Sequence, residues 1–353
     1  MKIAVLTSGG VDSAYSLISL KEKGYDVTAH YIKIWNPQYE EEGLLCPWRK
    51  DIQFVEQLCN QFHIELKVHN LQLDYEFTVL EYMLSELKRG GTPNPDILCN
   101  YFIKFGIFFE HISFNEYNYV ASGHYATKLN NDDEHIYWHK SDPKKDQSFF
   151  LSKLKPNQVK KIIFPCSGLN KSEIREAARQ WNLPQKDRKD SQGLCFLGNI
   201  NYSEFISRYI PIKKGHVYNL ESSELIGEHD GIHLYTEGQR IGISNPHGPW
   251  YVYKKDIKNN AIYVINRQSF HKHETSTLPI SDIVQYEKHV GKQVYLKIRH
   301  PQEKLIKGTI SSFDKISLED KFKPFQFSPG QIISIYEEDN FGYKLISSAK
   351  ITR

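Results

Sequence analysis

The residues best suited to chemistry begin at Ser8, where the chain runs Ser-Gly-Gly-Val-Asp-Ser to Ser13. This segment follows a short apolar stretch and precedes a helical pattern, which predicts a loop between a strand and a helix. Two glycines let backbone N–H groups approach an anion, and a helix N-terminus adds positive potential, so we expect a phosphate site. Asp12 would repel bare phosphate and therefore suggests Mg²⁺ between its carboxylate and a pyrophosphate. An ordinary glycine-rich turn is the alternative, and the pattern is neither a Walker A loop nor a dinucleotide-binding loop.

Two cysteines lie in surroundings that favour a reactive thiol. Cys99 closes the segment Gly-Thr-Pro-Asn-Pro-Asp-Ile-Leu-Cys, in which we expect Asp96 to be the N-cap of a helix and Cys99 to lie in its first turn. The helix dipole would there favour the thiolate. Cys195 follows a glycine and the cations of segment 186–189, which is also typical of a low-pKa thiol. A packed, inert cysteine is the alternative for each.

No metal site of the protein itself is expected, although the chain has 15 histidines. The nearby pairs Cys59 with His63 and His271 with His273 lack the four converging ligands of structural zinc. No CxxC is present to hold an iron–sulfur cluster. His124 follows the end of a predicted strand, which favours a functional role over that of an ordinary polar residue.

The first half of the chain alternates strand and helix patterns, and these elements must position the candidate residues. The predicted strands are 3–6, 27–34, 64–71 and 119–122, and the predicted helices are 13–23, 52–62, 76–88 and 101–112. The alternation predicts a parallel sheet with helices on both faces. Ligands bind such sheets beyond the carboxyl ends of the strands.

Glycines and turn signals become frequent after residue 205, and short alternating stretches occur at 293–298, 304–311 and 331–336. We therefore predict an α/β domain over 1–205, a small β-rich domain over 206–275 and a C-terminal β-barrel domain over 276–353.

The charge distribution and the composition indicate which kind of binding partner and which cell compartment to expect. The 353 residues carry a net charge of +3, but segment 140–214 has 16 lysines and arginines against 7 acidic residues. This excess favours a polyanionic partner, with a solvated charged face as the alternative. No apolar run is long enough for a membrane span, no signal-peptide pattern opens the chain, and only five cysteines occur. We expect a cytoplasmic protein with reduced thiols.

The ordered set of motifs resembles the bacterial and mitochondrial tRNA-specific 2-thiouridylases of the PP-loop ATP pyrophosphatase superfamily. The resemblance covers essentially the whole chain. Its motifs stand at 8–13, 91–100, 122–125, 145–148, 190–196, 237–240 and 329–331.

The resemblance implies a fold, a reaction and a set of roles. The α/β domain would be adenine nucleotide alpha hydrolase-like, and Mg²⁺ and ATP would serve to adenylate the C2 oxygen of the wobble uridine of tRNA. A persulfide on Cys195 would supply sulfur, with Cys99 as its partner thiol, possible disulfide formation between them, and Asp96 as a candidate acid or base. A protein sulfur donor, a cysteine desulfurase or a relay carrier, would load Cys195. The residues that would line the ATP site are Leu6, Thr7, Ser8, Gly9, Gly10, Val11, Asp12, Ser13, Ile32 and Gly123. Those that would contact the anticodon arm of tRNA are Asn94, Pro95, Asp96, His124, Lys145, Asp146, Gln147, Arg299, His300 and Gln331.

Two positions depart from the family, which commonly has Met at Ile32 and Tyr at His300. Two competing functions stay open at this point. One is a PP-loop enzyme that transfers nitrogen and needs no paired cysteines, and the other is an ATP-binding regulatory module without sulfur chemistry.

Overall fold

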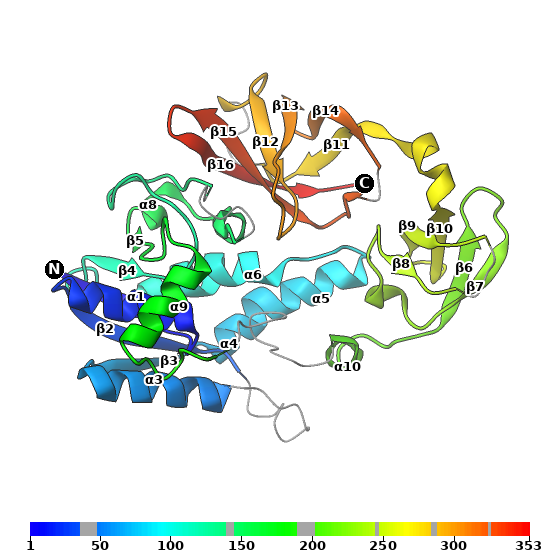
Figure 1. Ribbon diagram of the computed structural model, residues 1–353. Coiled ribbons are helices and arrows are strands. Elements are labelled where there is room, and N and C mark those ends of the chain that lie inside the picture. The colour runs from blue at the N-terminus through cyan, green and yellow to red at the C-terminus, as the bar shows by residue number, and fades with distance from the viewer. Residues whose placement is uncertain (36–47, 139–144, 189–201, 244–246, 284–287, 324–325) are drawn as a thin grey trace.

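The computed structural model describes the chain except residues 36–47, 139–144, 189–201, 244–246, 284–287 and 324–325. Three β-sheets organise the described residues, and they follow one another along the chain (Figure 1). We call the parts that they build the α/β domain, the middle sheet and the barrel. No helix in the described ranges is long and apolar enough to cross a membrane.

The α/β domain is built on a parallel sheet with strand order β3-β2-β1-β4-β5. Its strands are β1 (Lys2–Leu6), β2 (Asp26–Lys33), β3 (Leu66–Asn70), β4 (Tyr119–Ala121) and β5 (Ile162–Ile163). The first four confirm the predicted strands within a few residues. The fifth has only two residues, too few to show a period in the sequence.

Helices cover both faces of this sheet, as predicted. Ile3 and Val5 of β1 belong to one buried apolar cluster, and Ala4 and Leu6 belong to the other, because side chains alternate along a strand. Helices α1 (Val11–Glu22), α3 (Trp48–Phe62) and α9 (Lys171–Gln180) contribute to the first cluster. The second face is covered by α4 (Gln72–Tyr75), the π-helical η1 (Glu76–Leu80), α5 (Glu81–Lys88), α6 (Pro95–Leu98), the π-helical η2 (Cys99–Ile107) and α7 (Phe108–His111). Short helices η3 (Ser148–Leu151), α8 (Pro156–Val159) and α10 (Tyr202–Ser207) complete this domain.

The middle sheet has strand order β7-β6-β10-β9-β8 and its own small apolar core. Its strands are β6 (Gly215–Asn219), β7 (Leu225–His229), β8 (Arg240–Ile241), β9 (Trp250–Asp256) and β10 (Ala261–Asn266). The predicted β-rich character after residue 205 is confirmed.

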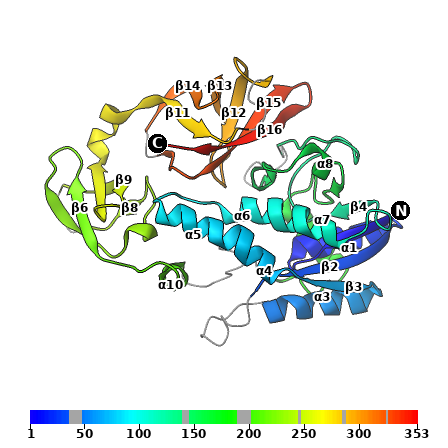
Figure 2. The ribbon, with the colours of Figure 1, turned by 180° about the vertical axis from the view of Figure 1, so that it is seen from behind.

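The barrel closes through six strands in the order β11-β14-β13-β12-β15-β16. They are β11 (Thr275–Ser281), β12 (Gln293–Lys297), β13 (Ile306–Ser312), β14 (Lys315–Phe322), β15 (Ile332–Asp339) and β16 (Gly342–Ile351). This confirms the predicted C-terminal barrel. Seen from behind, α5 and α6 run below the barrel toward the middle sheet (Figure 2).

A buried ion pair joins the barrel to the α/β domain. Lys297 Nζ of β12 lies 2.6 Å from Asp146 Oδ2, and both side chains are fully buried. Ser148 Oγ donates to the same carboxylate at 2.9 Å and lies 2.7 Å from the hydroxyl of Tyr336 on β15. A buried charge is tolerated only when it is paired and hydrogen-bonded, so this network fixes how the two parts meet.

Candidate active site

The glycine-rich loop lies at the carboxyl end of β1 and leads directly into α1. Gly9 has φ +78°, a left-handed conformation that favours glycine, and Gly10 is the N-cap of α1. No side chain caps this helix, which leaves the first-turn N–H groups for an anion. Ser13 Oγ donates to Gly10 O at 2.9 Å and accepts from Ser8 N at 3.2 Å, so the loop is braced internally. The residues therefore fit the triphosphate of ATP.

Gly123, just after the end of β4, packs closely against the backbone of this loop. A Cβ atom there would lie 3.0 Å from both Asp12 C and Ser13 N, closer than real Cβ contacts allow without a shift. Gly123 is therefore brought to the ATP candidate residues, as the resemblance implies. Ile32 lies on β2, next to β1, and packs half-buried against the apolar cluster that contains Leu6.

Asp12 is bound by two groups that the sequence analysis missed. Lys171 Nζ of α9 lies 2.7 and 2.8 Å from its two carboxylate oxygens, and the Tyr125 hydroxyl donates to Oδ1 at 2.8 Å. The Asp12 charge is therefore balanced without a metal. No group of three or more His, Cys, Asp or Glu side chains able to hold a metal occurs among the described residues.

Arg188 is a second cation at the loop. Its Nη1 donates to Gly9 O at 2.8 Å, and its Nη2 forms an ion pair with Asp51 of α3. Burial raises the pKa of the Asp51 carboxyl, and Arg188 opposes that shift. Arg175 Nη2 donates to the backbone oxygen of Arg188 at 3.0 Å. Cys195 and its motif lie outside the described residues, because the gap at 189–201 begins directly after Arg188.

The prediction that Asp96 is an N-cap is wrong, because Asn94 holds that position. Asn94 Oδ1 accepts from Ile97 N at 3.2 Å, and Pro95 is the first helical residue. Both Asn and Asp are good caps, and the fixed φ of proline favours its place just inside the helix. Asp96 therefore lies in the first turn, and Cys99 lies one position beyond that turn. Cys99 is buried in the cluster that also contains Leu6.

The His124 side chain lies beside Ser122 and beside Phe105 of η2. Its Nδ1 is 2.6 Å from Ser122 Oγ, and its ring centroid is 6.1 Å from that of Phe105 on η2. Burial, together with the charge of Lys104, holds the pKa of His124 well below its usual range. The side chain is therefore neutral at physiological pH and suited to hydrogen bonding.

The Lys145–Gln147 motif divides into different roles. Gln147 Oε1 accepts from Tyr125 N at 3.1 Å, which ties this motif to the residue that binds Asp12. Lys145 is half-buried. The Asp146 side chain differs from the expected tRNA contact, because it is fully enclosed in the ion pair with Lys297. We assign it a positioning role at the junction.

The barrel residues of the tRNA set lie at this junction and near α6. Arg299 is exposed, and the half-buried His300 ring lies 5.1 Å from Phe150. Burial and the charge of Lys297 lower the pKa of His300. The Gln331 side chain accepts from Ser328 N at 2.9 Å. Just before it, Pro329 O accepts from Thr92 N at 2.7 Å, so the 329–331 motif meets the segment that leads to Asn94.

A parallel α/β sheet with this loop at the end of its first strand defines a PP-loop protein. Family models for the "tRNA methyl transferase HUP domain" and the "tRNA methyl transferase PRC-barrel domain" match residues 1–199 and 203–266. The tRNA-specific 2-thiouridylase MnmA of Parabacteroides distasonis is 38% identical over 96% of each chain. The enzyme of that name from Malacoplasma penetrans is 37% identical over 96% of this chain and 95% of the relative. The chain belongs to the tRNA-specific 2-thiouridylase family. Among solved structures, a 4-thiouridine synthetase in complex with RNA and bound ATP is similar with a TM-score of 0.33 at 14% identity, covering 60% of this chain and 50% of that one.

Proposed function

We propose that this protein is a tRNA-uridine 2-sulfurtransferase that uses ATP to activate the wobble uridine. The observation that carries the proposal is the loop at Gly9 and Gly10, braced by Ser13 and flanked by Lys171 and Arg188, in a chain of this family. N–H groups at the start of α1 would bind phosphates, and the two cations would balance charge as pyrophosphate leaves. ATP enters as its Mg²⁺ complex, a substrate of the reaction.

The sulfur chemistry would need three steps after ATP binds. The C2 oxygen of uridine attacks the α-phosphate, pyrophosphate leaves, and the base becomes adenylated. The terminal sulfur of a Cys195 persulfide then attacks C2, and AMP leaves. The Cys99 thiolate attacks Cys195 Sγ, which forms a Cys99–Cys195 disulfide and leaves sulfur on the base. An external thiol reduces that disulfide. Alternatively, Cys99 attacks the persulfide first and releases hydrosulfide as the nucleophile.

The remaining roles follow the positions of the candidate residues. Asn94, Pro95 and Asp96, at the start of α6, would contact the target base, with Asp96 as acid or base. His124, Lys145, Gln147, Arg299, His300 and Gln331 would contact the anticodon arm. The proposal also includes a protein sulfur donor, a cytoplasmic location where tRNA, ATP and reduced thiols meet, and the division of the chain at 1–205, 206–275 and 276–353.

The test is nucleoside mass spectrometry of unmodified tRNA incubated with the protein, Mg-ATP, a thiol reductant, and a cysteine desulfurase with free cysteine as the source of persulfide sulfur. We expect ATP-dependent 2-thiouridine with the wild-type chain, its loss with Cys195→Ser or Cys99→Ser, and its retention with Cys59→Ser. Cys59 is a matched control because it is buried on α3. Pyrophosphate release without a thiolated nucleoside would refute the sulfur chemistry and favour a nitrogen-transferring PP-loop enzyme. The absence of tRNA-dependent pyrophosphate release would favour an ATP-binding module.

A further inference from the structure

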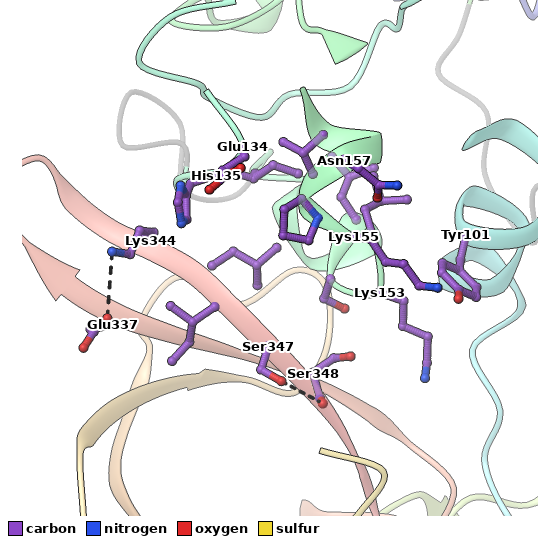
Figure 3. Close-up of a pocket in the computed structure, with 18 of the residues that line it drawn as sticks. Tyr101, Glu134, His135, Lys153, Lys155, Asn157, Glu337, Lys344, Ser347 and Ser348 are labelled. Carbon is purple, nitrogen blue, oxygen red and sulfur yellow. Dashed lines mark hydrogen bonds and ion pairs between the residues drawn. The ribbon is translucent and has the colours of Figure 1, made fainter. Parts of the chain in front are cut away.

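A cavity of about 730 Å³ lies between the α/β domain and the barrel (Figure 3). Segment 151–159, which includes α8, forms one wall, and strands β15 and β16 form the opposite wall. Tyr101 of η2 lines one end, and Glu134 and His135 line another. This volume is in the range of small-molecule sites, and an interface between two domains is a usual place for one.

The cavity is separate from the proposed reaction site. Tyr101 follows Cys99 by two residues on one helix, so their side chains project to roughly opposite sides. Cys99 faces the apolar cluster under the sheet, and Tyr101 faces the cavity. A ligand here would therefore not occupy the position of the reacting sulfur.

The walls carry more positive charge than their own carboxylates balance. Glu134 lies 3.0 Å from Lys160, and Glu337 lies 2.9 Å from Lys292, so each acidic group is already paired. Lys153 and Lys155 have no acidic partner within 4.0 Å in the described part of the chain. Figure 3 shows Lys155 reaching toward Tyr101 across the wall. Two unpaired ammonium groups on one wall favour an anionic ligand.

The two lysines differ in how far they are enclosed, because the Lys153 side chain is half-buried and Lys155 is exposed. Burial lowers the pKa of Lys153, a shift that a bound anion would reverse.

Apolar side chains supply the rest of the surface. Leu151, Leu154, Leu345 and Ile346 line the cavity beside the aromatic ring of Tyr101. Cationic groups next to an apolar, aromatic wall match a molecule that joins a phosphate to a flat ring. We propose that this cavity binds a nucleotide through its phosphate, with Lys153 and Lys155 as the phosphate ligands. The nucleotide is either free or part of the bound tRNA, and only the second source rests on the proposed function.

Lysine acetylation footprinting tests the site directly. The wild-type chain is labelled alone and with AMP, with pyrophosphate or with tRNA, and the modified lysines are read by mass spectrometry. Protection of Lys153 and Lys155 by AMP or pyrophosphate identifies a free nucleotide, and protection by tRNA alone identifies an RNA phosphate. Lys161, which lies over the Phe114 ring, is the internal control and should stay unprotected.

Paired variants give the energetic test. For the RNA source, Lys153→Ala/Lys155→Ala should weaken tRNA binding about tenfold and reduce the slope of log affinity against log salt by about 1.5. If the ligand is a free nucleotide, Lys153→Ala/Lys155→Ala should lose one AMP-binding site in calorimetry. Lys23→Ala/Lys161→Ala removes equal charge at exposed positions and should change neither quantity. The proposal is overturned if no probe protects the two lysines and both double variants behave alike. Protection without 2-thiouridine formation would retain the cavity and refute the proposed function.

Discussion

Arg188 Nη1 donates to the carbonyl oxygen of Gly9 at 2.8 Å, although 179 residues separate them in the chain. The same guanidinium pairs with Asp51 near the start of α3. One side chain thus joins the phosphate loop, a helix beside the sheet and the chain that leads to the Cys195 motif. The ATP loop depends on a residue that no local pattern marks.

Arg188→Ala should weaken ATP binding because the Gly9 carbonyl loses its donor and Asp51 loses its cation. Hydrogen bonds to charged groups contribute about 1.5–3 kcal/mol, so we expect an affinity loss of about 10- to 100-fold. Calorimetry with ATP measures it. Arg179→Ala removes an arginine from an exposed pair with Glu176 and should leave the affinity within about twofold. Equal affinities for the two variants would refute the role of Arg188.

Lys171→Met should leave the Asp12 carboxylate facing the phosphate loop without its ammonium partner. The unbalanced charge repels phosphate, and we expect the dissociation constant for ATP to rise about tenfold or more. Asp12→Asn/Lys171→Met removes both charges and should recover part of that loss. Binding titrations of both single variants and the double variant measure this coupling. Additive effects would show that the pair does not act as a unit.

Gly123→Ala should displace the start of α1, because its Cβ would lie 3.0 Å from the backbone of Asp12 and Ser13. Overpacking of this kind costs about 1–3 kcal/mol, and the displaced N–H groups should also bind ATP more weakly. Urea unfolding and ATP titration measure the two effects. Gly242→Ala is the control, because nothing lies within 4 Å of its added Cβ. Wild-type ATP affinity in Gly123→Ala would contradict the close approach.

Much of the fold could be predicted because its signals are local. The apolar alternation of β1, the glycines after it and the helical period of α1 lie within 22 residues. Long-range pairing is different: nothing around Lys171 or Arg188 in sequence indicates Asp12 or Gly9 as partners. The family resemblance implies a tRNA contact for Asp146, and only the fold shows that Lys297 encloses its side chain. At α6 the sequence pattern predicts Asp96 as the cap, whereas Asn94 caps the helix and Pro95 is its first residue.

Lys297→Met should destabilise the junction, because it leaves Asp146 buried without its cation. Breaking a buried pair by removing one partner costs about 3–5 kcal/mol, and urea unfolding measures it. Lys307→Met removes a lysine from an exposed pair with Glu319 and should cost less than about 0.5 kcal/mol. A loss below about 1 kcal/mol for Lys297→Met would show that the pair does not hold the barrel in place.

Acid should destabilise the α/β domain through His30. Burial, with the nearby charge of His69, lowers the pKa of His30 to about 3, whereas the unfolded chain titrates near 6.5. Below pH 6.5 the unfolded state therefore binds a proton that the folded state excludes, and stability falls as pH falls toward 3. Between pH 7.5 and pH 5 this contributes about 2 kcal/mol.

Urea unfolding at several pH values tests this contribution. His30→Gln removes the titrating group and should flatten the pH dependence by about 2 kcal/mol over that interval. His216→Gln, at an exposed position of β6, should leave the dependence unchanged. An unchanged slope in His30→Gln would show that His30 can take up a proton in the folded protein.

The fully buried pair of Asp146 and Lys297 also limits how this architecture can be recombined. The carboxylate comes from the α/β domain, and the ammonium group comes from the barrel. A barrel taken from a distant relative that lacks this lysine would leave the Asp146 carboxylate buried and unpaired where the two parts meet. Crossovers between the two ends of the gene are therefore penalised unless both partners travel together. The α/β domain and the barrel must therefore match each other at this contact, although the middle sheet separates them in sequence.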